Sequence, residues 1–239
     1  MSKLTLEELI VQETDDFIFI NKPPLISTLD DRAGTGTSIL RMAKEYCPEA
    51  QVCHRLDKET SGILLISKHN EAYKFAAIRF EHREIKKIYH AVTDGIHDFN
   101  VMHVNLPITP LPNGIVKIDR QGGKPAETFF RTLEVYKYHT LVECMPVTGR
   151  MHQIRVHLAT IGASITADTQ YGGKLPYLSR LKKKFNLKKD TEEQPMIKRF
   201  ALHARRLELE NPNGGEMLRV EAPYLKDMEV LIKLLGKNK

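Results

Sequence analysis

The sequence predicts an α+β fold, because its apolar residues follow a helical period in some segments and a period close to two in others. The period-two region extends from Lys87 to about Val147, where short turns separate several strands in series. Short connections favour antiparallel pairing, and strands outnumber helices along the chain. The turn signals are Asp94-Gly95, Asn113-Gly114 and Gly122-Gly123, and the expected strands cover 87–93, 101–108, 114–119, 125–135 and 139–147.

Strands and helices alternate ahead of this region. Phe17 to Ile20 is a short apolar strand that Asn21-Lys22-Pro23-Pro24 ends, and a second strand covers 63–67. A helix is expected over 37–46 with Thr37 as its N-cap, and another over 70–83 with Asn70 as its N-cap.

The last third of the chain combines both kinds of element. A helix is expected over 152–161, where Gly162 would end it. Strands near 200–209 and 217–222 precede a final helix over 226–235. The lysine-rich segment 180–189 is interpreted either as a surface helix with one apolar face or as a solvated run of charges.

Composition limits the class of protein. With 239 residues, 41% of them hydrophobic, the chain can bury one sizeable core or two small lobes that share one. Its apolar runs are too short to span a membrane, and acids near the N-terminus argue against an export signal. Cys47, Cys53 and Cys144 form no CxxC pair, which predicts reduced thiols in the cytoplasm, without a zinc site or a disulfide.

The charge pattern favours a phosphate-rich partner without requiring one. The formal net charge is +6, and it is unevenly distributed. The first sixteen residues are acidic, whereas lysines gather at 182–184 and 188–189.

The segment His54-Arg55-Leu56-Asp57-Lys58 places one acid between basic neighbours, just before Thr60-Ser61-Gly62 and an apolar strand. Such surroundings keep a carboxylate ionised and fixed in position, as a nucleophile or a general base requires. Most clusters of this kind are solvated loops, so the pattern alone makes Asp57 a candidate and no more.

The helix over 152–161 carries a second candidate. Arg155 lies next to the apolar positions Ile154 and Leu158, where an unpartnered guanidinium would be costly. It either pairs with a carboxylate such as Asp57 or extends along the surface to reach solvent. His152 and His157 lie about 140° apart around the helix, so they cannot ligate one metal together, and no metal site is expected.

Tyr89 lies on the strand over 87–93 with basic neighbours. Its ring is either a packing residue with a satisfied hydroxyl or, in a nucleotide pocket, a surface on which a flipped base stacks.

Together these motifs resemble the RluA-type RNA pseudouridine synthases, over residues from about 15 to 230. HRLD with TSG, followed by TGRxHQIRVHL, is the most specific part of the resemblance. The matching segments are Ile20-Asn21-Lys22-Pro23-Pro24, His54-Arg55-Leu56-Asp57 with Thr60-Ser61-Gly62, Lys87-Ile88-Tyr89-His90-Ala91, 148–158, Asp168-Thr169-Gln170-Tyr171-Gly172 and Ala201-Leu202-His203-Ala204.

The resemblance implies a long, mixed, mostly antiparallel sheet with flanking helices, bisected by an active-site cleft. It also implies an enzyme that cuts the C1′–N1 bond of specific uridines in RNA, turns the uracil and rejoins it through C5. This isomerisation involves no redox change and no net hydrolysis, so no cofactor is expected. Ribosomal RNA is the favoured substrate and transfer RNA the second choice.

Site residues follow by the same resemblance. Asp57 would be the catalytic aspartate, Arg155 its ion-pair partner, and Tyr89 the ring that stacks on the uracil. Arg55 would enter the RNA helix where the flipped nucleotide left, and Leu202 would wall the base pocket. Further contacts with RNA are expected from His54, Arg150, Lys182, Lys183 and Lys184.

The chain departs from the family pattern at Met151, usually Ser or Thr, and at Ala167, usually Gly; both are interpreted as local packing changes. Residues 1–239 are expected to form one catalytic domain with an N-terminal extension over 1–16 and a basic insertion over 174–198. No N-terminal S4 domain is expected, because only about sixteen residues precede the first strand.

Two other classes of function remain. One is an RNA-binding protein or RNA-folding chaperone that keeps the scaffold without catalysis. The other is a hydrolase that stops after cutting the glycosidic bond, which would need a second carboxylate. A monomer is expected, because no self-complementary apolar stripe is seen.

Overall fold

The computed structural model describes residues 4–30, 36–182, 184–187 and 191–239. The chain divides into two compact units. Unit 1 combines the residues up to Ile88 with His203–Pro223, and unit 2 combines Tyr89–Leu202 with Tyr224–Lys239. The α+β class is confirmed, since both units contain sheets and helices.

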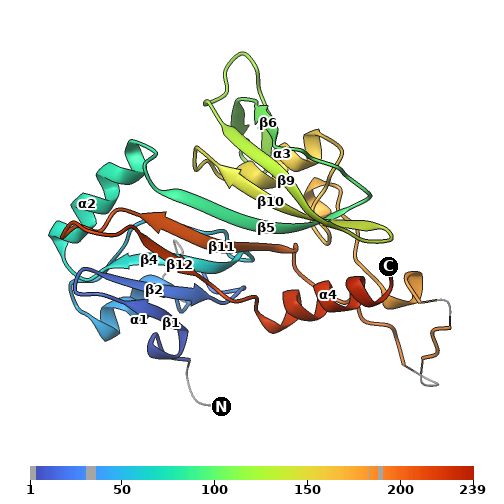
Figure 1. The fold of residues 1–239 in the computed structure, drawn as a ribbon, viewed down its shortest axis with the longest axis horizontal. Coiled ribbons are helices and arrows are strands. Elements are labelled where there is room, and N and C mark those ends of the chain that lie inside the picture. The colour runs from blue at the N-terminus through green and yellow to red at the C-terminus, as the bar shows by residue number, and fades with distance from the viewer. Residues whose placement is uncertain (1–3, 31–35, 183, 188–190) are drawn as a thin grey trace. The chain divides into compact units, whose positions relative to one another are not determined.

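Unit 1 is built on a mixed sheet whose strands follow the order β1-β2-β4-β11 (Figure 1). Strand β3 pairs with β4 and β12 with β11; β4 and β11 run parallel, whereas the other pairs are antiparallel. The bounds are η1 Glu7–Leu9, β1 Ile10–Glu13, β2 Phe17–Lys22, α1 Ile39–Tyr46, β3 Gln51–Val52, β4 Ser61–Ser67, α2 Asn70–Glu81, β11 Leu202–Leu209 and β12 Leu218–Glu221.

The centre of this sheet is also the centre of the core of unit 1. Every residue of β2 and of β4 is buried. Continuous burial explains why both strands read as unbroken apolar runs rather than as an alternating pattern. Helix α1 packs on β3, and α2 on β3 and β4.

Unit 2 contains an antiparallel sheet in the order β5-β10-β9-β6 and a separate pair, β7-β8. Strand β5 begins in unit 1 and continues into unit 2. The bounds are β5 Lys86–Asp94, β6 Met102–Asn105, β7 Ile108–Pro110, β8 Val116–Ile118, β9 Glu127–Val135, β10 His139–Pro146, α3 Gln153–Thr160, η2 Thr169–Tyr171, η3 Leu178–Arg180 and α4 Lys226–Lys237. Its core joins residues of β5, β9 and β10 with residues of α3 and α4.

Three local predictions were wrong. The N-caps are Ser38 and His69 rather than Thr37 and Asn70, since their side chains accept hydrogen bonds from the N–H groups of Arg41 and Ala72. The strand expected over 101–108 is two strands, β6 and β7, because Pro107 between them has no N–H to donate. For segment 180–189, where a surface helix and a solvated run of charges were both left open, the described residues after Arg180 form no α-helix.

Candidate active site

Asp57 lies in unit 1, in the loop between β3 and β4, and it is half-buried. The backbone on its N-terminal side is held by Thr28: the N–H of Leu56 donates to Thr28 Oγ1 (3.1 Å), which donates to the Leu56 carbonyl (2.9 Å). On the other side, the N–H of Thr60 donates to the Asp57 carbonyl (3.0 Å). The loop therefore fixes the backbone from which the carboxylate projects.

Lys22 reinforces the same loop from β2. Its side chain is fully buried, and Nζ donates to the carbonyls of Pro23 (2.9 Å), Ile26 (2.9 Å) and Lys58 (3.2 Å). The Lys58 carbonyl also accepts from the N–H of Leu25 (2.8 Å). A buried ammonium bonded to carbonyls satisfies the rule that buried charges need partners. Asn21-Lys22-Pro23-Pro24 was predicted to end a strand and matched a family motif, but neither observation indicated this role of Lys22.

His54, which the sequence analysis assigned to RNA contact, packs inside unit 1. Its Nε2 accepts a hydrogen bond from the N–H of Leu65 (3.1 Å), and its ring lies 5.0 Å from the ring of Phe80. Burial, with the nearby charge of Lys87, lowers the pKa of His54 to about 3. The imidazole is therefore neutral near pH 7 and supports β4. Arg55, by contrast, is exposed.

The TSG motif is explained by close packing between β4 and β11. Gly62 has φ +112°, and a Cβ at this position would lie 2.2 Å from the carbonyl oxygen of Ala204. Beside it, Ser61 Oγ and His203 Nδ1 are hydrogen-bonded at 2.9 Å. The motifs around residues 60–62 and 201–204 thus meet at one strand pair.

Arg155 lies on α3 in unit 2, buried, and pairs with Asp168. Its Nε donates to Asp168 Oδ2 (2.7 Å), Nη2 donates to Asp168 Oδ1 (2.7 Å), and Nη2 also donates to Gln170 (2.8 Å). The guanidinium carbon lies 4.8 Å from the ring centre of Tyr171 and 4.2 Å from that of Phe200. Such a bidentate, stacked arrangement suits arginine and not lysine.

The interpretation of Arg155 as a surface residue was therefore wrong, and the need for a carboxylate partner is confirmed. Asp57 was predicted as that partner and Asp168 was not, although Asp168-Thr169-Gln170-Tyr171-Gly172 was among the matching motifs. Because Asp57 and Arg155 belong to different units, their pairing stays a prediction.

Tyr171 organises the surroundings of this pair. Its hydroxyl accepts from the N–H of Val116 (2.8 Å) and is hydrogen-bonded to His152 Nδ1 (2.9 Å). His152, which directly precedes α3, has a left-handed backbone with φ 53°. Ala167, which directly precedes Asp168, is also left-handed, with φ 65°. Strain of this kind is typical of functional sites. The prediction that Ala167 is a packing change was wrong, because its position requires a backbone that glycine adopts more easily.

The other predicted site residues of unit 2 differ in exposure. Tyr89 is half-buried on β5, opposite Cys144 of β10, and packs against the core of unit 2. Leu202 is buried, and its carbonyl accepts from Arg199 (3.1 Å).

The basic residues assigned to RNA contact are at the surface where they are described. Arg150 is exposed, and its Nε donates to the Pro125 carbonyl (3.3 Å). Lys182 and Lys184 are exposed, whereas Lys183 lies outside the described residues.

His157 is held by two internal hydrogen bonds, to Thr128 Oγ1 and to the Leu106 carbonyl, both at 3.0 Å. Within the described ranges, no three His, Cys, Asp or Glu side chains are grouped as a metal site would need. Among the same residues, no helix has the length and hydropathy to cross a membrane.

Comparisons with known proteins identify the family. Residues 16–160 match the model of the RNA pseudouridylate synthase family. The chain is 34% identical to ribosomal large subunit pseudouridine synthase C of Salmonella typhi, over 96% of this chain and 70% of that protein. It is 35% identical to synthase C of Escherichia coli K12, over 91% of this chain and 67% of that protein. Synthase D of Neisseria meningitidis serogroup B is also 35% identical, over 95% of this chain and 60% of that protein.

Solved structures show the same fold. The human RNA pseudouridylate synthase domain containing 4 superposes with a TM-score of 0.72 at 24% identity, covering 97% of this chain and 94% of that one. The human domain containing 1 gives 0.65 at 22% identity, covering 99% and 98%. The chain therefore belongs to the RNA pseudouridylate synthase family, as the RluA-type motifs predicted, and it is an isomerase that acts on RNA.

Proposed function

We propose that this enzyme converts uridines of large-subunit ribosomal RNA to pseudouridine, with Asp57 as the catalytic aspartate. The relatives synthase C and synthase D carry the large ribosomal subunit in their names, which supports this substrate over transfer RNA. The observation that carries the role of Asp57 is its loop, where Thr28 holds residue 56 and the buried Lys22 holds residue 58. A carboxylate on a fixed backbone is what nucleophilic or general-base chemistry requires.

The reaction exchanges one bond of the nucleoside for another. The C1′–N1 bond breaks, the uracil turns in the pocket, and a C1′–C5 bond forms while the C5 proton is lost and N1 gains one. Asp57 acts on the ribose, either by attack at C1′ or by removal of the 2′ proton, and both roles use the ionised form. Since substrate and product have the same composition and oxidation state, the chemistry calls for no cofactor.

The remaining roles are assigned by the family motifs. Arg155, held by Asp168 and stacked on Tyr171, is proposed to pair with Asp57 and to hold its carboxylate in position. Tyr89 is proposed to stack on the uracil, and Leu202 to wall its pocket. The exposed Arg55 is proposed to fill the space that the flipped nucleotide leaves in the RNA.

The test measures tritium release from transcripts that contain [5-³H]uridine. Wild-type protein and a control variant with an exposed acid removed, Asp15→Asn, should both release tritium from a large-subunit ribosomal transcript, whereas Asp57→Asn should not. Asparagine keeps the shape of the side chain and removes only its charge. Release by Asp57→Asn at the wild-type rate would exclude the catalytic role. Release from transfer RNA alone would exclude the proposed substrate.

The basic insertion 174–198 is proposed as an added RNA contact, since Lys182 and Lys184 are exposed. Replacing Lys182, Lys183, Lys184, Lys188 and Lys189 by glutamine should weaken RNA binding and flatten its dependence on salt. Removing one lysine–phosphate interaction lowers the slope of log K against log salt by about 0.9 for duplex RNA, taking the duplex DNA value. Unchanged affinity and slope would rule out a role of the insertion in RNA binding.

We further propose that the enzyme acts as a monomer in the cytoplasm. The three cysteines are free thiols, which suits a reducing compartment.

A further inference from the structure

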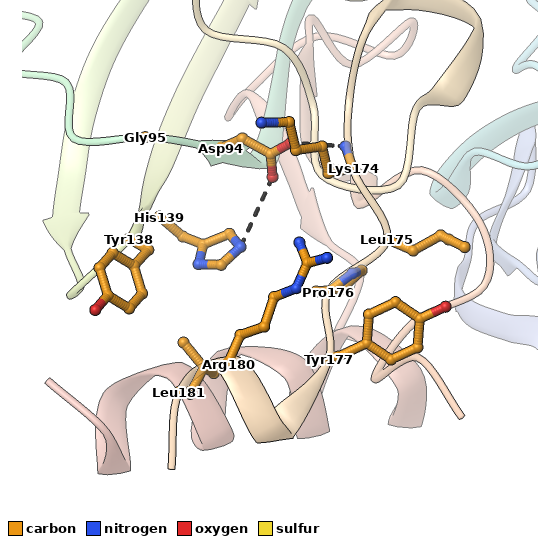
Figure 2. Close-up of a pocket in the computed structure, with 10 residues that line it drawn as sticks. All are labelled: Asp94, Gly95, Tyr138, His139, Lys174, Leu175, Pro176, Tyr177, Arg180 and Leu181. Carbon is orange, nitrogen blue, oxygen red and sulfur yellow. Dashed lines mark hydrogen bonds and ion pairs between the residues drawn. The ribbon is translucent and has the colours of Figure 1, made fainter. Parts of the chain in front are cut away.

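Unit 2 contains a pocket of about 450 Å³ that none of the roles above uses. It lies where β5 ends, and its walls come from the turn before β10 and from the start of the basic insertion (Figure 2). The volume falls within the range of small-ligand sites. The lining residues that bear charge or an aromatic ring are Asp94, Tyr138, His139, Lys174, Tyr177 and Arg180.

The acid in this pocket is already engaged with the protein. Asp94 Oδ1 accepts from Thr166 Oγ1 (2.8 Å), and Oδ2 accepts from the N–H of Lys174 (2.7 Å). His139 Nε2 lies 3.7 Å from Oδ1. The exposed side chains of Lys174 and Arg180 are the cations of the lining, so the pocket favours an anionic ligand.

Two tyrosines also line the pocket, beside aliphatic residues. Tyr138 and Tyr177 lie on opposite sides of the pocket, and the guanidinium of Arg180 points into the space between them (Figure 2). Tyr138 is 51% exposed, so its ring is accessible. Glu193 also lies beside this turn: its carboxylate accepts from the N–H of Ser179 (2.8 Å), and the charge of Arg180 is among the causes that lower its pKa. Guanidinium binds phosphate through paired hydrogen bonds, and tyrosine rings stack on nucleobases.

We propose that this pocket binds one nucleotide of the substrate RNA other than the target uridine. Arg180 and Lys174 would contact its phosphate, and Tyr138 would stack on its base. The proposal rests on RNA being the substrate. Asp94 follows Tyr89 by five residues along β5, which separates the pocket from the proposed uracil platform by roughly 17 Å. Because residues five apart project from opposite faces of a strand, an RNA that occupies both sites has to pass from one face of the sheet to the other at the end of β5.

Two variants test the proposed phosphate contact and the proposed base contact separately. Binding of a short, fluorescently labelled single-stranded RNA of mixed sequence is measured by anisotropy over a series of salt concentrations. Arg180→Gln should weaken binding and lower the salt slope by about 0.7, the value for one phosphate contact with a single strand. Tyr138→Ala should weaken binding about tenfold, as expected when one base no longer stacks, and should leave the slope unchanged.

Lys74→Gln is the matched control, because it removes one charge from an exposed lysine of α2 in unit 1. It should change neither affinity nor slope. Equal losses in Lys74→Gln and Arg180→Gln would overturn the proposal in favour of general electrostatic attraction. Wild-type binding by Arg180→Gln and Tyr138→Ala would overturn it as well.

Calorimetric titration with uridine monophosphate separates RNA from a free nucleotide as the occupant. Binding of the monophosphate that Arg180→Gln abolishes, with RNA binding unchanged, would overturn the proposal and assign the pocket to a free nucleotide. None of these measurements uses catalysis. A wild-type protein that releases no tritium would therefore contradict the proposed function and leave this test valid.

Discussion

Arg155 and Asp168 form a buried ion pair in which each charge depends on the other. Asp168→Asn keeps the shape of the side chain and removes the carboxylate from a buried guanidinium. Breaking such a pair on one side costs about 3–5 kcal/mol, far more than an exposed pair contributes. We therefore expect the free energy of unfolding, measured in urea, to fall by about that amount.

Asp98→Asn is the control for this substitution, because Asp98 is an exposed acid of the same unit. It should change the free energy of unfolding by no more than about 0.5 kcal/mol. Similar stability of Asp168→Asn and Asp98→Asn would show that the buried pair is not needed for folding.

Ala167, next to Asp168, allows a test of how much its left-handed backbone lowers the free energy of unfolding. Its φ of 65° costs an L-residue roughly 1–2 kcal/mol, whereas glycine adopts it freely. Glycine also increases the freedom of the unfolded chain and removes a buried methyl group, and together these offset about 1–2 kcal/mol. Ala167→Gly should therefore leave the free energy of unfolding within about 1 kcal/mol of the wild-type value, as thermal unfolding can measure. Ala43→Gly, at a buried position inside α1 without such strain, should lower it by about 2 kcal/mol; an equal loss in Ala167→Gly would contradict the strain argument.

At the residue scale, the sequence shows that a buried charge requires a partner better than it shows which residue provides that partner. The position of Arg155 beside Ile154 and Leu158 indicates that its charge requires compensation. Which acid provides it depends on the path of the chain after α3, which local patterns do not define. Lys22 illustrates the same limit, because its three carbonyl partners lie in two separate segments.

Among the secondary-structure elements, the contact between β4 and β11 has the tightest steric requirement. A methyl group at Gly62 would meet the backbone of Ala204, which cannot move without breaking the strand pair. We expect Gly62→Ala to cost more than about 3 kcal/mol, because overpacking and a φ of +112° act together. Urea unfolding measures the loss, and the yield of folded protein is a second measure.

Gly214, in the turn between β11 and β12, is the matched control. Its φ is also positive, +76°, but nothing lies within 4 Å of a Cβ placed there. Gly214→Ala should therefore cost only the backbone term, roughly 1–2 kcal/mol. Equal losses at the two glycines would mean that the contact with Ala204 adds nothing.

Most elements were predictable because burial and period leave clear patterns. The fully buried strands β2 and β4 read as apolar runs, and α4 as an amphipathic helix. The errors occurred where a single residue determines where a helix begins or a strand ends. Ser38 caps α1 although Thr37 is an equally good capping residue, and Pro107 divides one apolar segment into two strands.

At the scale of the whole molecule, strand order was the part that the sequence did not predict. Short turns indicate neighbouring antiparallel strands, as between β9 and β10. The parallel pair of β4 and β11 brings together Ser61 and His203, which are 142 residues apart. Both segments belong to the family motifs, but no pairing between them was predicted.

Three histidines, His157 buried and His54 and His139 half-buried, predict how stability depends on pH. Burial, with the charge of Lys87, lowers the pKa of His54 from 6.5 to about 3. Burial also lowers the pKa of His139, opposed by Asp94, and that of His157, opposed by its bond to Leu106. Above pH 6.5 these side chains are neutral in the folded and unfolded states alike. Below it, the unfolded chain gains more protons at these sites than the folded chain does, so stability falls as pH falls, and for His54 the fall extends toward pH 3.

For His54 alone the slope is at most about 1.4 kcal/mol per pH unit in that range. Urea unfolding at a series of pH values measures it. His54→Gln can still accept from the N–H of Leu65 through its amide oxygen and cannot titrate. We expect this variant to be less stable at pH 7, where the packing against Phe80 is lost, but to lose less stability on acidification. His82→Gln, at an exposed site, should keep the wild-type slope. If the His54→Gln slope matched that of wild type, His54 would titrate alike in both states and the decline would belong to other groups.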